Sequence, residues 1–208
     1  MSNQLVNEIK LHCDALTKKF DEIAEERKKS LQKLSTYIQE KRNKHLPIQL
    51  IFICTHNSRR SHFGQVWAAV AAAYYSIKNV HTYSGGTEAT AFNPNAIRAL
   101  KNLGFRIEGD TSNTNPNYSV KFGEGLQTIC FSKTFDDPAN PSSNFAAIMT
   151  CSHAEENCPF VPGTELRIGI TYDDPKDFDG THQQDEKYME RSNQIALEIL
   201  YTFSLVIN

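Results

Sequence analysis

The chain lacks the hallmarks of several large protein classes. Its 208 residues carry 22 Lys and Arg against 24 Asp and Glu, and a net charge of −2 argues against nucleic-acid binding by bulk positive charge. No apolar run approaches the length of about 18 residues that a membrane span needs, so we expect no membrane association. The opening Met-Ser-Asn-Gln-Leu lacks the apolar core of a signal peptide, which predicts a cytoplasmic protein.

Cysteine is scarce, odd in number and never spaced as Cys-x2-Cys. The five positions are Cys13, Cys54, Cys130, Cys151 and Cys158. An odd count in a presumed reducing compartment is not a disulfide framework, so each thiol is either core filler or reactive. A zinc site of Cys151, Cys158 and His153 would be one ligand short. We therefore expect no metal and no bound cofactor.

Proline and glycine are absent from residues 1–46. Apolar residues recur there at helical spacing, which predicts two helices over about 3–20 and 25–45. Cys13 lies on the apolar stripe of the first, where a structural role is expected. This N-terminal helical extension carries no catalytic pattern. It is either a cap on the following domain or a hairpin for dimerisation or partner docking.

Strands and helices alternate after Pro47. Apolar runs predict core strands at 50–53, 80–83, 145–150 and 166–171, with helices between them and a final helix over about 182–206. Asn93-Pro94 is typical of a helix start and Gly104 of its end. A β-hairpin is expected at 118–122 and 127–133. Cys130 lies within it, so we expect this thiol to be structural. The alternation predicts an α/β fold with a mainly parallel sheet and a ligand site at the carboxyl ends of its strands.

The first of these strands runs directly into Cys54-Thr55-His56-Asn57-Ser58-Arg59-Arg60-Ser61. A loop of this size between a strand and a helix can turn its backbone N–H groups inward and cradle a tetrahedral oxyanion. The guanidinium of Arg60 matches two anion oxygens. The same environment would favour the thiolate of Cys54, which is the nucleophilic form. Ser61 could donate its hydroxyl to that sulfur, and Asn57 tolerates left-handed backbone.

These residues resemble the phosphate loop of the low-molecular-weight protein tyrosine phosphatase superfamily, and within it the chain looks closest to the thioredoxin-coupled arsenate reductases. Tyr83–Glu88 with Asn93-Pro94, and Asp173-Asp174-Pro175, resemble two further motifs of the superfamily. The likeness covers about residues 48–206. It implies a phosphatase-like three-layer domain over 47–208 with a four-stranded sheet flanked by helices, preceded by the extension 1–46 and interrupted by an insertion at 113–144.

The resemblance also implies a role for each site residue. Cys54 would be the nucleophile and Asp174 the general acid, although an Asp before Pro is also common in turns. Ser84 would support the loop through hydrogen bonds, together with Asn57 and Ser61. The oxyanion-binding loop would comprise Thr55, His56, Asn57, Ser58, Arg59, Arg60 and Ser61. Arg59 stands where the family commonly has a Cys and adds a second cation.

Cys151 and Cys158 separate two branches of the superfamily. The resemblance to the arsenate reductases implies that Cys54 attacks arsenate, that Cys151 then attacks Cys54 and expels arsenite, and that Cys158 moves the disulfide outward to be reduced by thioredoxin. A phosphatase needs one cysteine, because water hydrolyses its phosphocysteine. Reduction of arsenate needs two electrons, and hence two further thiols.

Three functions stay open from the sequence. The first is a thioredoxin-coupled arsenate reductase. The second is a phosphatase of the same fold that hydrolyses phosphomonoesters through Cys54 and Asp174. The third is a non-catalytic oxyanion-binding or redox-sensing module, in which Cys54 would be unreactive toward alkylating reagents.

Overall fold

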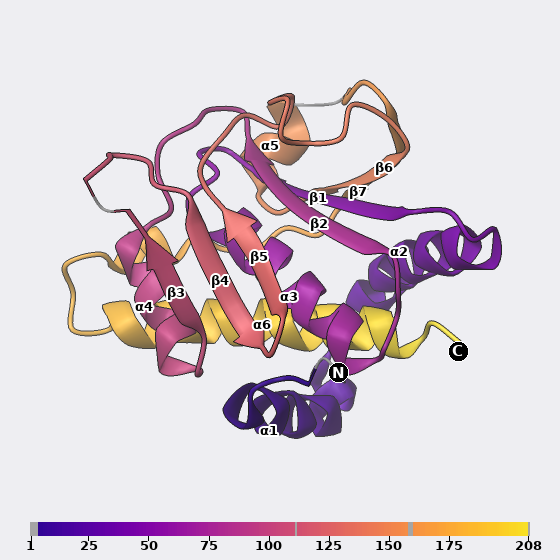
Figure 1. Ribbon diagram of the computed structural model, residues 1–208, viewed down its shortest axis with the longest axis horizontal. Coiled ribbons are helices and arrows are strands. Elements are labelled where there is room, and N and C mark those ends of the chain that lie inside the picture. Colours follow the sequence, from indigo (N-terminus) through magenta and orange to yellow (C-terminus); the bar gives the residue numbers. More distant parts are fainter. Residues whose placement is uncertain (1–3, 111, 158–159, 208) are drawn as a thin grey trace.

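Four parallel strands form the central sheet of the computed structural model, which describes residues 4–110, 112–157 and 160–207 (Figure 1). They are β1 (Ile48–Cys54), β2 (Val80–Gly86), β6 (Phe145–Met149) and β7 (Thr164–Gly169), in the order β2-β1-β6-β7. The predicted four-stranded parallel sheet is confirmed. Because β1 and β6 are parallel neighbours, Cys54 and Cys151 both lie at the carboxyl end of the sheet.

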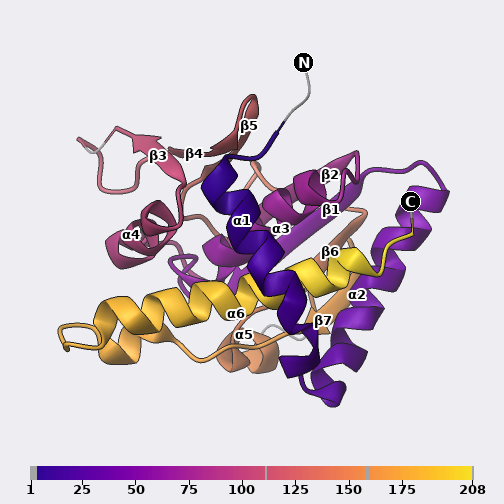
Figure 2. The same ribbon diagram turned by 90° about the horizontal axis from the view of Figure 1, so that it is seen from below.

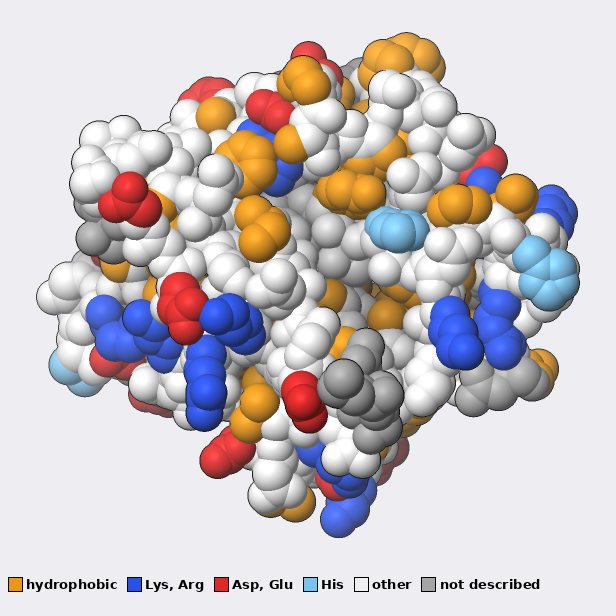
Figure 3. All heavy atoms as spheres, in the orientation of Figure 1, with side chains coloured by type: hydrophobic (Ala, Val, Ile, Leu, Met, Phe, Trp, Pro, Cys, Tyr) orange, Lys and Arg blue, Asp and Glu red, His pale blue; other side chains and the backbone are white. Residues whose placement is uncertain are grey.

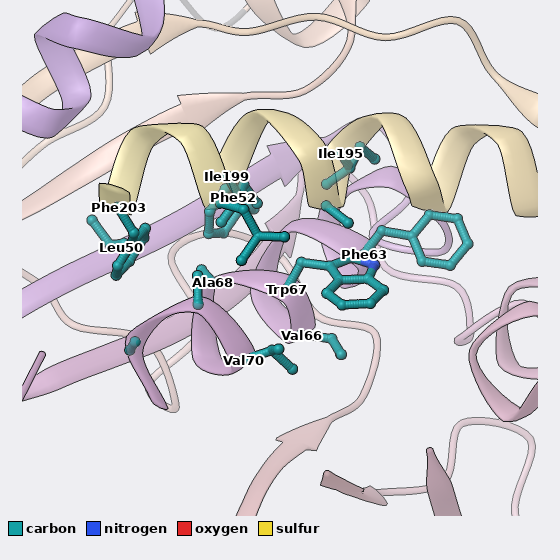
Figure 4. Close-up of a cluster of buried hydrophobic side chains, with 14 of the residues drawn as sticks. Leu50, Phe52, Phe63, Val66, Trp67, Ala68, Val70, Ile195, Ile199 and Phe203 are labelled. Carbon is teal, nitrogen blue, oxygen red and sulfur yellow. The ribbon is translucent and has the colours of Figure 1, made fainter. Parts of the chain in front are cut away.

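Strand β1 is buried on both faces, which explains its unbroken apolar run. Leu50 and Phe52 face the larger hydrophobic cluster, whereas Ile51 and Ile53 face a smaller one. Helices α3 (Arg60–Tyr74) and α6 (Gln184–Ser204) cover the first face, and the short helix α5 (Ser152–Asn157) lies on the second. Figure 4 shows the side chains that fill the space between α3, α6 and the sheet, with Trp67 among them. These layers match the predicted α/β architecture.

The N-terminal helices share this core. Helix α1 (Asn7–Leu16) is followed by a 3-10 turn (Thr17–Glu22) and by α2 (Glu25–Asn43). Their buried side chains, among them Cys13, belong to the larger cluster, and Figure 2 shows α1 crossing α6. Residues 1–46 were predicted as two helices, and the described part of that segment adds the 3-10 turn between them.

A second, antiparallel sheet lies beside the first, in the order β3-β4-β5. Strands β4 (Tyr118–Gly123) and β5 (Leu126–Cys130) are the predicted hairpin. Strand β3 (Arg106–Gly109) was not predicted, since it is short and buries only Ile107. A groove of about 670 Å³ opens between β5 and β2 (Figure 3). It is lined by the first half of β2 and so lies away from the carboxyl edge of the sheet.

Two predicted boundaries follow local rules. Helix α4 (Pro94–Asn102) is capped by Asn93, whose side chain accepts hydrogen bonds from the N–H groups of Asn95 and Ala96. Gly104 ends it with φ +95°. Within the described ranges, no helix is both long and apolar enough to cross a membrane.

Candidate active site

The loop from Cys54 to Arg60 turns its carbonyl groups outward. The carbonyl oxygens of Cys54, Thr55 and Ser58 accept hydrogen bonds from N–H groups of segment 87–93, at 3.1, 2.8 and 2.9 Å. Asn57 has φ +44°, which allows the reversal of the chain. The N–H groups of 56–59 have no acceptor among the residues that the structure describes. The loop therefore has the polarity of an anion cradle.

Gly86, at the end of β2, supports the back of this loop. A Cβ atom there would lie 2.2 Å from the carbonyl oxygen of Glu88, 2.7 Å from the nitrogen of Asn57 and 2.7 Å from the oxygen of Thr55. Only glycine permits this approach without displacing backbone. Gly86 belongs to a motif noted in the sequence, but no role was predicted for it. The signal that could have identified it is the Ser-Gly-Gly step at the end of a strand.

Cys54 is buried at the base of the loop. Its sulfur lies 3.1 Å from the hydroxyl oxygen of Ser61, and the side-chain amide of Asn57 donates to that same oxygen at 2.9 Å. Because the Ser61 oxygen already accepts from Asn57, its own proton is available to the sulfur. A hydrogen bond donated to sulfur stabilises a thiolate. The structure thus brings together Cys54, Asn57 and Ser61, three of the residues predicted for the site.

Arg60 begins α3 and is almost fully buried. Its Nη1 donates to the carbonyl oxygen of Tyr172 at 2.8 Å, and its Nη2 donates to Oδ2 of Asp174 at 2.6 Å. Its Nε is buried and has no hydrogen-bond partner among the described residues. A buried donor without an acceptor is costly, and it is explained where a ligand supplies the acceptor.

Asp174 is also bound by Arg59. Nε and Nη2 of Arg59 donate to the two carboxylate oxygens at 2.8 and 3.1 Å. Burial by itself raises the pKa of Asp174, but the hydrogen bonds of Arg59 and the charges of both guanidinium groups hold it below its usual value. Asp174 also caps the 3-10 turn Pro175–Phe178, accepting from the N–H of Lys176. The predicted acid therefore does lie at the loop, paired with two arginines.

Cys151 approaches the loop from β6. Its sulfur lies 3.5 Å from the hydroxyl oxygen of Thr55 and accepts a hydrogen bond from the N–H of Ala154 at 3.4 Å. The same hydroxyl lies 3.3 Å from Nδ1 of His153. Cys158 lies outside the described residues, so its pairing with Cys151 stays a prediction.

Ser84 supports the site indirectly, through two side chains of α3. Its hydroxyl donates to Oε1 of Gln65 at 2.7 Å and lies 3.2 Å from Nδ1 of His62. Both partners belong to α3, so these contacts fix the helix that follows the loop, whereas direct hydrogen bonds to the loop were expected.

The segment after β5 contributes to the site, which the sequence analysis did not predict. The hydroxyl of Ser132 donates to the carbonyl oxygen of His56 at 3.0 Å, and the N–H of Lys133 donates to Oδ1 of Asn57 at 2.9 Å. The hydroxyl of Ser58 donates to the carbonyl oxygen of Ala91 at 2.7 Å. The predicted insertion thus holds the outer side of the loop. No sequence signal marks these contacts, because they join segments far apart in the chain.

Cys13 and Cys130 are chemically quiet. Both are fully buried, and burial raises the pKa of each thiol to about 12. Thiolate formation is therefore strongly disfavoured at both. Over the described ranges, no cluster of three or more His, Cys, Asp and Glu side chains could hold a metal ion.

Sequence comparison relates the chain to bacterial enzymes, although no family model matches it. An arsenate reductase from Staphylococcus aureus (strain Newman) is 31% identical over 126 residues, which are 61% of this chain and 77% of that protein. An arsenate reductase from Halalkalibacterium halodurans is 28% identical over 135 residues, 65% of this chain and 79% of that protein.

Solved structures show the fold. A mutant of YwlE from Bacillus subtilis superposes with a TM-score of 0.52 at 14% identity, covering 76% of this chain and 97% of that one. An arsenate reductase in its phosphate-binding state gives a TM-score of 0.51 at 16% identity, covering 77% and 99%. A low-molecular-weight phosphotyrosine phosphatase from Vibrio cholerae O395 gives 0.51 at 11%, covering 74% and 93%. The predicted phosphatase-like fold is confirmed.

Proposed function

Because the chain belongs to the arsenate reductase family, we propose that it reduces arsenate to arsenite, with Cys54 as nucleophile and thioredoxin as the final reductant. One observation carries the proposal: a second thiol, that of Cys151, lies against the loop that holds Cys54, through the hydroxyl of Thr55. A phosphate-ester hydrolase has no use for a thiol in that place.

In the first step, arsenate binds in the loop between the N–H groups of 56–59 and the guanidinium of Arg60. The orphaned Nε of Arg60 supports this assignment. The thiolate of Cys54, stabilised by Ser61, attacks arsenic. A sulfur–arsenic bond forms, and one oxygen leaves as water after it has accepted protons. Asp174 is ionised while both arginines hold it, so it would first take up a proton and then pass it to that oxygen.

In the second step, the thiolate of Cys151 attacks the sulfur of Cys54. A disulfide forms, the sulfur–arsenic bond breaks, and its electron pair stays on arsenic, which leaves as arsenite. The N–H of Ala154 and the hydroxyl of Thr55 are placed to stabilise the attacking thiolate.

In the third step, Cys158 attacks Cys151 and frees the Cys54 thiolate. The dithiol of thioredoxin then reduces the Cys151–Cys158 disulfide and is itself oxidised. Disulfide formation requires Cα atoms within about 7 Å, whereas the described residues between the two thiols, Ser152–Asn157, are helical. We propose that this helix opens during the relay. The cycle needs a reducing compartment, for which we propose the cytoplasm.

A phosphatase is the second candidate. The contact between Asp174 and Arg60 favours it, because a carboxyl beside the oxyanion site is what protonation of an ester oxygen requires. The two functions differ in which thiols they need.

The test is arsenate-dependent oxidation of NADPH in the presence of thioredoxin and thioredoxin reductase. Cys54→Ser, Cys151→Ser and Cys158→Ser should each abolish it, whereas the matched thiol variant Cys13→Ala should retain it. Hydrolysis of p-nitrophenyl phosphate should require Cys54 only. Full arsenate turnover by Cys158→Ser would disprove the relay. Hydrolysis without any arsenate-driven thiol oxidation would establish the phosphatase. If neither occurs and Cys54 resists alkylation, the module is non-catalytic.

A further inference from the structure

The carboxylate of Asp174 accepts hydrogen bonds from both arginines of the loop, Arg59 and Arg60. We propose that Asp174 is an internal anion, which an incoming oxyanion displaces from Arg60, and that Arg59 is the positioning residue that keeps hold of the carboxylate during this exchange. The inference rests on the proposed function in one respect, namely that the loop binds a tetrahedral oxyanion.

The geometry of Arg60 favours the exchange. A guanidinium binds an oxyanion in bidentate fashion through two nitrogens on one edge. Nη1 of Arg60 is committed to the backbone oxygen of Tyr172. The remaining edge, Nε with Nη2, is half free: Nε has no partner among the described residues, whereas Nη2 donates to Asp174. Two oxygens of a substrate on that edge would share Nη2 with the Asp174 carboxylate, and the repulsion between two anions held by one nitrogen favours the release of Asp174.

Arg59 keeps the charge of Asp174 compensated after Arg60 releases it. Asp174 exposes 19% of its side chain and Arg59 only 9%, so a carboxylate left without a partner there would be poorly solvated. Arg59 holds it through both Nε and Nη2, and the N–H of Lys176 holds Oδ1. When Arg60 turns to the substrate, these contacts remain. Asp174 then stays beside the bound anion, where it can take up a proton and pass it to the leaving oxygen.

The local charges offer a matched control. Asp173 precedes Asp174 but exposes 92% of its side chain and contacts Arg191 on α6. Neutralising Asp173 removes the same formal charge from the same turn without freeing Arg60. General repulsion between the turn and a dianion would act through both aspartates, and salt would screen it. Displacement from Arg60 involves Asp174 alone.

Isothermal titration of the full chain with inorganic phosphate tests the exchange. Asp174→Asn should bind phosphate about tenfold more tightly than the unmodified protein, which corresponds to one charge-assisted hydrogen bond no longer broken on binding. Asp173→Asn should bind with unchanged affinity. Equal affinities of the unmodified protein and Asp174→Asn, or equal gains in both variants, would overturn the exchange. If the unmodified protein binds no phosphate, the proposed oxyanion site itself fails.

A double-mutant cycle tests the role of Arg59. In the Arg59→Gln background, phosphate must strip Asp174 of its last arginine, so the gain from Asp174→Asn should exceed the gain in the unmodified background by at least threefold. If Arg59 merely adds positive charge, the two gains will be equal, and its positioning role is refuted. Arg59→Lys, which keeps the charge but not the two-nitrogen grip, should lie between these limits.

Discussion

The hydroxyl oxygen of Thr55 lies 3.5 Å from the sulfur of Cys151 and links segments that are 96 residues apart in the chain. Thr55 follows Cys54, the proposed nucleophile, at the end of β1, and Cys151 follows β6, the parallel neighbour of β1. This contact joins the second thiol of the proposed relay to the proposed oxyanion-binding loop. A reductase of this fold needs a second thiol near Cys54, whereas a phosphatase does not.

Thr55→Val should impair the second thiol step. The substitution removes the hydroxyl beside Cys151 and keeps the branched shape, so the ratio of arsenate turnover to p-nitrophenyl phosphate hydrolysis should fall about tenfold, as expected for the loss of one hydrogen bond to a charged group. Thr55→Ser keeps the hydroxyl and should restore the ratio. An unchanged ratio in Thr55→Val would show that the contact has no part in the relay.

Ser61→Ala should slow the reaction of Cys54 with iodoacetamide. The hydroxyl is oriented by Asn57 so that its proton can reach the sulfur at 3.1 Å. Without that donor the thiolate loses one hydrogen bond, and the alkylation rate near neutral pH should drop several-fold to about tenfold. Ser132→Ala, which removes a hydroxyl from the outer side of the loop, is the control. Similar rates in Ser61→Ala and the unmodified protein would contradict the assignment.

The sequence predicts most of the central domain because its signals are local. The run Leu50–Ile53 marks a strand that is buried on both faces, and Asn93-Pro94 with Gly104 marks the limits of α4. Burial and backbone conformation leave a periodic or positional trace in the chain. The loop after β1 is recognisable for the same reason, since its spacing is set by one strand end and one helix start.

The contacts that tune the site leave no such trace. Arg59 and Asp174 are 115 residues apart, and neither segment indicates that the two side chains pair. Lys133 reaches Asn57 through a backbone N–H, which every residue except proline possesses. Strand β3 pairs with β4 although only Ile107 is buried in it. Such features depend on which segments meet in space. The pattern of a single sequence indicates which residues are buried, but not which residues they contact.

Gly86→Ala should damage the loop more than the fold. The new methyl group would meet three backbone atoms at 2.2 to 2.7 Å, those of Glu88, Asn57 and Thr55. The loop must shift to admit it, so we expect phosphate affinity and arsenate turnover to fall at least tenfold, because displacement by about 1 Å is costly for catalysis. Circular dichroism should show an intact fold. Gly180→Ala is the control: with φ +76° and open space around it, this glycine would gain backbone strain but no contact with the loop, so phosphate affinity should be retained.

The N-terminal helices are expected to stabilise the domain through Arg27. Its Nε donates to Oε2 of Glu198 at 2.8 Å, and its Nη2 donates to the carbonyl oxygen of Thr171. Arg27→Met leaves the buried Glu198 without its cation and should cost about 3 kcal/mol in the free energy of unfolding, measured with urea. Lys29→Met breaks an exposed pair with Glu26 and should change it by about 0.5 kcal/mol or less. Equal effects would place the stabilisation elsewhere.

The stability of the protein should depend on pH through His62, which stacks on Phe92 with ring centroids 4.1 Å apart. Burial, helped by the positive charge of Lys133, lowers the pKa of His62 from 6.5 to about 3. Between these values the unfolded chain binds a proton that the folded chain does not. The free energy of unfolding must therefore fall as the pH falls below 6.5, with a slope that approaches about 1.4 kcal/mol per pH unit from this group.

Urea titrations between pH 7 and pH 5 measure this slope. His62→Leu removes the titrating group and should make the dependence shallower by about 1 kcal/mol per pH unit over the lower half of that range. His182 is exposed, so His182→Leu is the matched control and should leave the slope as it is in the unmodified protein. Identical slopes in His62→Leu and the unmodified protein would mean that His62 is protonated within the fold. The helix start that carries Arg59 and Arg60 would then hold a third buried cation, and His62→Leu should weaken phosphate binding as well.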